Sequence, residues 1–229
     1  MSVSEIAEFL ETPTGKDKMI RTLCYAAKLT SALVKSESAS EKLNSFGSQL
    51  SNCRVILRLF DDFPQLSCTL EYGLGAQERD VYLRFFNVLR NLVDQAFFPI
   101  EHIEWLADNN YINVRSEPWA VCSTWCWVIS LALSLMKSLR TIKNMNKRKK
   151  SLKEVDSEHK DAVGMAAKRR REVLSAVRNV IDLIHAIHCL PPGFLWSSRL
   201  SRLQVGTVGT LSSLLGLYMA VTSFRASRA

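Results

Sequence analysis

The side chains that could perform catalysis or bind a metal ion form only a few short groups in this 229-residue sequence. Asp182, His185 and His188 follow one another at steps of three residues, so that on a helix they would share one side and could form a weak metal site. Histidines satisfied within a helical fold explain the same spacing, and no Ser/His/Asp or Cys/His arrangement stands out. We therefore expect no catalytic residue, no cofactor and no metal site, and we expect that the protein is not an enzyme.

Charged and apolar residues are segregated along the chain, although the overall composition is ordinary. Hydrophobic residues make up 47% and charged residues 23%, close to the average of globular proteins, and the net charge is +8. Residues 1–117 carry 12 Lys or Arg and 16 Asp or Glu, whereas residues 137–202 carry 16 and 6. The basic excess therefore belongs to the middle of the chain, between two long uncharged runs.

The first uncharged run covers the 19 residues 118–136, between Glu117 and Lys137. As a helix it would be roughly 29 Å long, close to the hydrocarbon thickness of a bilayer. Tryptophans lie toward its start and a basic segment follows its end, as is typical of a membrane span. We predict a membrane-spanning helix over residues 118–137; the alternative is a buried core helix of a soluble protein.

The second uncharged run covers the 22 residues 203–224 and is less apolar. We predict a second membrane-spanning helix over residues 203–224, followed by a short tail at 225–229. Small residues recur in this run at helical spacing, and they are Gly209, Ser212, Ser213, Gly216 and Ala220. Because small residues let helices approach closely in lipid, this face predicts an oligomer contact; the alternative is a flexible segment rich in glycine and serine.

The segment from Glu41 to Phe60 has the apolar spacing of an amphipathic helix. Its apolar positions recur at alternating steps of three and four residues, and they are Leu43, Phe46, Leu50, Cys53, Leu57 and Phe60. Arg54 and Arg58, one turn apart, lie beside this stripe. The helix should end before Pro64, because the residue before a proline is pushed out of the α region.

Two basic clusters lie between the uncharged runs, in a segment (138–202) that we predict to be a basic loop with an amphipathic helix. They consist of Lys147, Arg148, Lys149, Lys150, Lys168, Arg169, Arg170 and Arg171. Basic clusters next to a membrane span attract anionic headgroups, and a membrane-protein import receptor could also recognise them. A bipartite nuclear localisation signal has the same pattern, but the neighbouring apolar run favours the membrane.

No segment alternates with period two for long enough to predict a strand. We therefore expect an all-α membrane protein, with amphipathic helices that interact with the membrane in residues 1–117 and with two membrane-spanning helices. The six cysteines are scattered without metal-ligand spacing, and we expect them to be reduced thiols.

Several blocks of the sequence, in order along nearly the whole chain, resemble one protein family. The blocks are residues 15–25 (GKDKMIRTLCY), 53–62 (CRVILRLFDD), 72–77 (YGLGAQ), 91–95 (NLVDQ) and 188–193 (HCLPPG). They are similar to the peroxin-11 family, in particular to its gamma-type members in the peroxisomal membrane.

The resemblance implies a membrane protein that promotes peroxisome elongation, division and proliferation. In this family an amphipathic helix of the N-terminal half inserts into the cytosolic leaflet, and the matching stretch is Glu41 to Phe60. Apolar side chains wedged into one leaflet favour positive membrane curvature, while Arg54 and Arg58 could contact lipid headgroups. The family is usually drawn with both termini in the cytosol, whereas the basic segment by itself would place the middle of the chain there.

We therefore expect a multi-pass peroxisomal membrane protein that remodels its membrane through amphipathic-helix insertion and oligomerisation. The expected partners are peroxisomal membrane lipids, copies of itself and other members of the family, the organelle fission machinery and a membrane-protein import receptor. No nucleic-acid partner is expected. Two alternatives remain open: a soluble helical adaptor with basic nuclear-type signals, and a pore-forming peroxisomal membrane protein.

Overall fold

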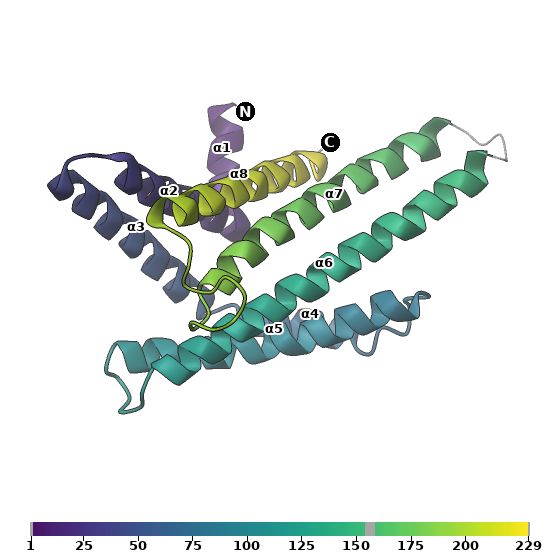
Figure 1. Cartoon of the computed structure of the whole chain (residues 1–229). Helices are drawn as coiled ribbons and strands as arrows, with labels where there is room; N and C mark the ends of the chain where they lie inside the picture. Colours follow the sequence, from purple (N-terminus) through teal and green to yellow (C-terminus); the bar gives the residue numbers. More distant parts are fainter. Residues whose placement is uncertain (1, 154–158, 229) are drawn as a thin grey trace. The chain divides into compact units, whose positions relative to one another are not determined.

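The computed structural model describes residues 2–153 and 159–228 of the chain, with side chains described outside 149–163. The described residues form eight α-helices and no strand, which confirms the all-α prediction (Figure 1). The helices are α1 (Val3–Glu11), α2 (Pro13–Leu33), α3 (Glu37–Arg58), α4 (Asp62–Tyr72), α5 (Val81–Asp108), α6 (Glu117–Lys153), α7 (His159–His188) and α8 (Arg202–Ala226). The chain divides into two compact units: unit 1 combines Met1–Phe60 with Ile184–Ala229, and unit 2 is Asp61–Leu183.

In unit 1, α2 and α3 pack side by side in opposite directions (Figure 1). Local sequence signals set their starts: Thr12 caps α2, Pro13 is its first residue, and Ser36 caps α3. Gly47 permits the close contact between the helices, because a Cβ atom there would lie 3.2 Å from the carbonyl oxygen of Cys24. Across the same contact, the Cys24 thiol donates a hydrogen bond to the carbonyl oxygen of Gly47, with 3.2 Å between sulfur and oxygen.

The helix α8 packs along another side of α2. The two helices come closest at two glycines of α8. A Cβ atom on Gly209 would lie 2.0 Å from the ring of Tyr25, and a Cβ atom on Gly206 would lie 2.7 Å from the backbone of Leu29. Glycine is therefore required at both positions for this packing, because any side chain would push the helices apart.

Tyr25 is buried at this contact and meets the last turn of α7. Its hydroxyl lies 3.3 Å from Nδ1 of His185, and the two rings meet edge to face with centroids 5.4 Å apart. Burial raises the pKa of Tyr25 to about 12, so its hydroxyl stays protonated at physiological pH. The pair ties the end of α7 to α2 within unit 1.

In unit 2, α5 and α6 form a long antiparallel pair (Figure 1). At one end Asp80, the N-cap of α5, accepts hydrogen bonds from Arg140 Nε at 2.7 Å and Asn144 Nδ2 at 2.6 Å. Toward the other end, the Ser123 hydroxyl donates to Glu104 Oε2 at 2.6 Å. The hydrogen bonds from Arg140 and then Asn144 hold the pKa of Asp80 far below its usual range, so this end of the pair is fixed by an ionised carboxylate.

The helix α4 packs on α5. It starts before Pro64, whereas the sequence led us to expect only that the preceding helix ends there. As expected, α3 ends before this proline, at Arg58, but a new helix already begins at Asp62. Pro64 therefore lies in the first turn of α4, where the missing backbone N–H has no helical partner to lose. Asp62 Oδ2 lies 3.3 Å from Nδ1 of His102 and so joins α4 to α5.

The helix α7 runs antiparallel to α6 within unit 2. Asn179 Nδ2 donates a hydrogen bond to the Ser134 hydroxyl at 3.1 Å, and Arg169 Nε donates to Asn146 Oδ1 at 3.1 Å. The helix α6 contains the expected span 118–137 but continues to Lys153 without a break. Its basic half is therefore helical rather than a loop.

We predict that Gly209→Ala destabilises unit 1, because the added methyl group would collide with the Tyr25 ring. Overpacking of this kind costs about 1–3 kcal/mol, so the midpoint of thermal unfolding of the full-length chain in neutral detergent should fall. Gly164→Ala in α7 is the matched control, because a Cβ atom there meets nothing within 4 Å. The control should keep or raise the midpoint, since alanine favours helix; equal midpoints for both variants would contradict the close approach.

Candidate membrane-interaction surfaces

The apolar stripe that the sequence predicts on α3 lies largely on the surface of unit 1. Phe46 is 52% exposed and Leu57 is 46% exposed, while Phe60, which follows the end of the helix, is 77% exposed. Cys53 is also exposed, and Leu43 and Leu50 are half-buried. The side of α3 that packs on α2 is marked by the buried Gly47, which lies one turn from the half-buried Leu43 and Leu50 and so borders the stripe. The rest of unit 1 therefore leaves Phe46, Cys53, Leu57 and Phe60 uncovered.

The two arginines beside the stripe have partners within the protein. Arg54 Nε lies 2.7 Å from Asp17 Oδ1 on α2, and Arg58 is half-buried. Burial alone would raise the pKa of Asp17, but the charges of Arg54 and Lys18 outweigh it and hold this pKa well below its usual range. Headgroup contact by Arg54 and Arg58 stays a prediction, and at Arg54 a headgroup would have to compete with Asp17.

A second exposed apolar stripe lies on α4 in unit 2, and the sequence analysis did not find it. Phe63 is 81% exposed, Leu70 is 72% exposed, and Leu66 between them is exposed as well. These residues recur at steps of three and four, so the signal was present in the sequence. It was missed because Pro64 was interpreted only as the end of the preceding helix.

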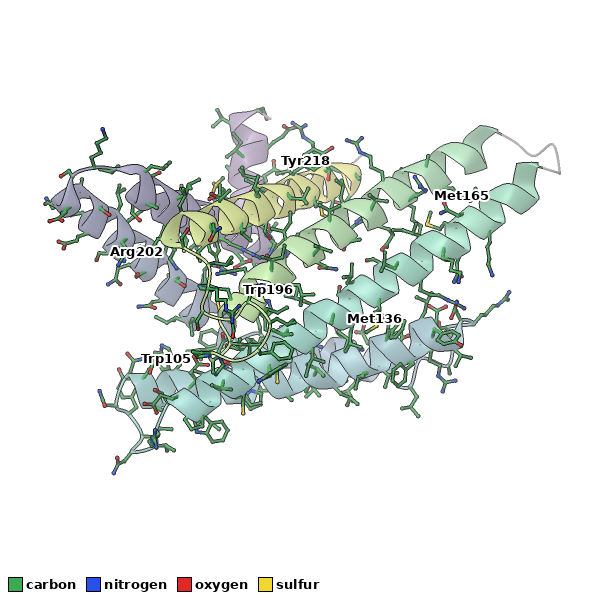
Figure 2. The ribbon with its side chains drawn as sticks, viewed as in Figure 1. Trp105, Met136, Met165, Trp196, Arg202 and Tyr218 are labelled. Atoms are coloured by element: carbon green, nitrogen blue, oxygen red, sulfur yellow. The ribbon has the colours of Figure 1, made fainter. Side chains whose placement is uncertain are left out.

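Two helices are long and apolar enough to cross a membrane: α6 over Glu117–Arg148, and α8 over Arg202–Ala226. This confirms the fold prediction of two such helices, while the bounds 118–137 and 203–224 of the spans stay predictions. The exposed residues of α6 between 118 and 136 are Pro118, Cys122, Ile129 and Met136. Of these four, Figure 2 labels Met136. None of these side chains is charged, so the outer surface of α6 suits hydrocarbon.

The inner side of the apolar part of α6 faces carboxylates of α5. The Ser130 hydroxyl donates a hydrogen bond to Asp94 Oδ1 at 2.5 Å, in addition to the bond between Ser123 and Glu104. Arg90 lies one turn before Asp94, with 3.2 Å between Nε and Oδ2. Sequence analysis gave these α5 residues no role, because the spacing of charges along one helix does not reveal which neighbour they face.

The basic clusters lie beyond the apolar part of α6. Lys147 and Arg148 are exposed near its end, and Lys168, Arg169, Arg170 and Arg171 are exposed on α7. The hydrogen bond from Arg169 to Asn146 brings both clusters to the same end of unit 2. Arg148 is 12 residues past Met136, or about 18 Å along the helix. Lys149 and Lys150 lie outside the residues whose side chains are described.

The small-residue face of α8 is packed against α2 of the same chain. Gly209, Ser212, Ser213 and Gly216 are buried, and Ala220 is half-buried. The close helix approach that the spacing predicts is therefore present, with α2 as the partner. An oligomer contact through this face stays a prediction. The opposite side of α8 exposes Leu211, Leu214 and Tyr218, the last of which is labelled in Figure 2.

The two ends of the chain are clasped together in unit 1. Glu8 Oε2 of α1 lies 2.6 Å from Arg228 Nη1, and Glu5 Oε2 lies 3.6 Å from Arg225 Nη2. Beneath these ion pairs, the rings of Phe9 and Phe224 meet edge to face with centroids 5.5 Å apart. The C-terminal end of α8 is therefore held beside the first helix.

Metal binding finds no support in the part of the chain that the structure describes. Among these residues no group of three or more His, Cys, Asp or Glu side chains could hold an ion. The prominent surfaces are instead apolar stripes, apolar helices and clustered cations. Such surfaces suit contact with the acyl chains and headgroups of a bilayer.

Comparison with known proteins gives matches over nearly the whole chain. The model of the family described as Peroxisomal biogenesis factor 11 (PEX11) matches residues 3–221. The human protein named Peroxisomal membrane protein 11C is 37% identical over 227 residues, which cover 96% of this chain and 94% of the relative. The mouse protein of the same name is 34% identical over 99% of this chain and 98% of the relative.

A more distant relative is the Saccharomyces cerevisiae protein named Peroxisomal membrane protein PMP27. It is 22% identical over 223 residues, which cover 93% of this chain and 86% of the relative. No solved structure matches the chain. The family resemblance inferred from the sequence blocks is thereby confirmed.

We predict that acid weakens the contact between α2 and α3. Because the pKa of Asp17 is lower in the folded protein than in the unfolded chain, its ion pair with Arg54 stabilises the fold above about pH 4. That stability is lost as the pH falls from the unfolded value toward the folded one. The measurement is the midpoint of thermal unfolding of the full-length chain in neutral detergent from pH 7 to pH 3.

Two variants control for this prediction. Asp17→Asn should unfold at a lower temperature at pH 7 and should lose less of its stability on acidification than the parent. Glu11→Gln removes another carboxylate, an exposed one on α1, and should follow the parent curve. Parallel curves for Asp17→Asn and the parent would show that the pair does not stabilise the fold.

Proposed function

This chain belongs to the peroxisomal biogenesis factor 11 family, and we propose that it remodels the peroxisomal membrane through insertion of the apolar stripe of α3. In this role it promotes the elongation, division and proliferation of peroxisomes. The observation that carries the proposal is the exposure of Phe46, Leu57 and Phe60, which the rest of unit 1 leaves uncovered.

The physical basis of the activity is asymmetric insertion. A helix that lies in the plane of the membrane with its apolar side chains in one leaflet expands that leaflet and favours positive curvature. The other sides of α3 carry exposed polar residues such as Glu41, Asn44 and Asn52, which suit the headgroup region and the water beyond it. Insertion would therefore be shallow and confined to one leaflet, as curvature generation requires.

The driving force for insertion is mostly apolar. Arg54 is already paired with Asp17, so α3 offers few cations to anionic headgroups. Transfer of the exposed parts of Phe46, Leu57 and Phe60 from water to lipid is worth about 3–5 kcal/mol in total, at about 1.5–3 kcal/mol for each fully buried side chain. Anchoring by apolar helices elsewhere in the chain would keep α3 at the membrane and so make this modest free energy effective.

We place the protein in the peroxisomal membrane as a multi-pass protein with both termini in the cytosol. The clasp of Glu5 and Glu8 with Arg225 and Arg228 supports a common side for the two termini. The assignment of this common side to the cytosol rests on family resemblance. In the family, the amphipathic helix of the N-terminal half inserts into the cytosolic leaflet. The relatives named for the peroxisomal membrane support the same location.

Partners follow from the remaining surfaces. Exposed cations of the basic clusters suit anionic headgroups or a membrane-protein import receptor, both of which recognise positive charge beside an apolar helix. Copies of the chain and other family members are proposed to assemble with it, and the organelle fission machinery would act on the elongated membrane. The small-residue face of α8 could serve in assembly only if α8 exchanged α2 for another helix.

We predict that the full-length double variant Phe46→Glu, Leu57→Glu loses most of its ability to tubulate liposomes of peroxisomal lipid composition. Two carboxylates on the stripe would oppose its transfer into the leaflet. Tubules per liposome, counted by electron microscopy, should fall at least fivefold. Asn52→Glu is the control, because it places a charge on an exposed position of the same helix away from the stripe, and it should tubulate like the parent.

Alkaline carbonate extraction of both variants separates loss of the wedge from loss of anchoring. The proposal expects the double variant to remain in the membrane pellet, since the apolar helices α6 and α8 are unchanged. Undiminished tubulation by the double variant would refute the role of the stripe.

We also predict that epitope tags at the two termini behave alike on intact peroxisomes. Both should be digested by added protease without detergent, while a matrix enzyme in the same organelles stays intact. Digestion of one tag and protection of the other would contradict the common side that the clasp supports.

A further inference from the structure

Unit 2 distributes its polar and apolar side chains in the opposite way from a water-soluble helical bundle. Between residues 85 and 107 of α5, the exposed residues are Phe85, Leu92, Ala96 and Pro99, and Leu92 is 58% exposed. Between residues 172 and 183 of α7, they are Val177 and Val180. The exposed residues of α6 over its apolar part are uncharged as well. The three helices thus share an apolar exterior.

The polar side chains of the same segments point at one another. Asp94 and Glu104 of α5 accept hydrogen bonds from hydroxyls of α6, as described above. Asn179 of α7 donates to the hydroxyl of Ser134 on α6, and Asp182 lies 3.5 Å from Arg178 one turn away. Polar side chains of these segments therefore lie inside unit 2, beside the buried apolar residues Val128 and Leu133.

This arrangement is unfavourable in water and favourable in hydrocarbon. In water, the exposed positions of a helix pair carry polar residues and the contact between helices is apolar. In lipid, polar groups must find partners within the protein, and apolar side chains can face outward without cost. The hydrogen bonds between α5 and α6 are the internal partners that hydrocarbon requires.

The length of the largely apolar exterior of α5 matches a bilayer. Fully exposed charged residues occur at its two ends, at Arg84 and Asp108, with 23 residues between them. Between them the Arg90 side chain is 39% exposed and is paired with Asp94. The residues between the two ends would span about 35 Å as a helix, slightly more than the hydrocarbon core. Trp105 lies near the second end, with its ring 5.7 Å from that of Tyr111, as expected of aromatic residues at an interface.

We propose that α5 and residues 172–183 of α7 lie in the hydrocarbon together with α6, so that unit 2 is a membrane-embedded bundle rather than the neighbour of a single span. The outer surface of unit 2 would contact the acyl chains of the bilayer. The inference rests on the proposed function in one respect, the membrane insertion of α6, whose exterior continues into that of α5.

The helices of unit 2 pair antiparallel in turn. The helix α4 runs antiparallel to α5, since Asp62 meets His102 and Tyr72 meets Asn87. The helix α7 runs antiparallel to α6. The chain therefore enters unit 2 and leaves it toward the same end.

The test places a fluorescent bimane on single cysteines of the full-length chain, whose six native cysteines are replaced by alanine. Leu92→Cys reports on α5 and Val180→Cys on α7; Phe85→Cys is a second site on α5 if the first variant misfolds. Ile129→Cys on α6 is the positive control, and Gln77→Cys, exposed before α5, is the negative control. Each protein is reconstituted into vesicles whose phosphatidylcholine carries bromine on its acyl chains, which quenches only a nearby bimane.

Quenching at positions 92 and 180 should be within twofold of that at 129 and at least threefold above that at 77. Quenching at 129 alone would overturn the inference and leave the span of α6 intact. Absence of quenching at all sites would instead overturn the membrane insertion on which the proposed function rests. Protection of position 92 from a water-soluble maleimide without quenching would show that protein covers α5, which also overturns the inference.

Discussion

The hydrogen bonds from hydroxyls of α6 to carboxylates of α5 are the interactions on which the rest of unit 2 depends. A single carboxylate in the middle of a membrane span costs about 2.5–3.5 kcal/mol. Ser130 and Ser123 give Asp94 and Glu104 partners inside the helix pair, and Arg90 offsets the charge of Asp94. Because these polar groups are satisfied internally, both helices can present mostly apolar side chains outward over the apolar part of α6 and the segment of α5 that faces it.

Under the proposed function, anchoring and curvature generation are separate physical tasks. The stripe on α3 gains only a few kcal/mol from the leaflet, which corresponds to about a thousandfold preference and is too little to hold a protein on a membrane at low concentration. An embedded body in the same chain makes insertion intramolecular, so a weak stripe is sufficient. A weak stripe also inserts reversibly, which suits an activity that must follow changes in membrane shape.

The sequence predicted what depends on spacing within one helix and missed what depends on the neighbour of that helix. The exposed stripe from Phe46 to Phe60, the apolar part of α6 and the family were found because each is a pattern along the chain. The embedding of α5 was not anticipated, since Asp94 and Glu104 count as charges until a structure shows that they face α6. The helix α4 was not predicted, because a proline such as Pro64 is compatible both with the end of one helix and with the first turn of the next.

The small-residue face of α8 is a second case in which the sequence does not identify the neighbouring helix. Spacing of Gly209, Ser212 and Gly216 specifies a close helix contact but not the helix that makes it. The structure gives this contact to α2, where Ser212 accepts a hydrogen bond from Arg21 and Gly209 leaves room for Tyr25. A second copy could use the face only by displacing α2, which would bring buried Arg21 and Tyr25 to the surface. Self-association that preserves unit 1 therefore has to use another surface, and the outward side of α8 exposes Leu211 and Leu214.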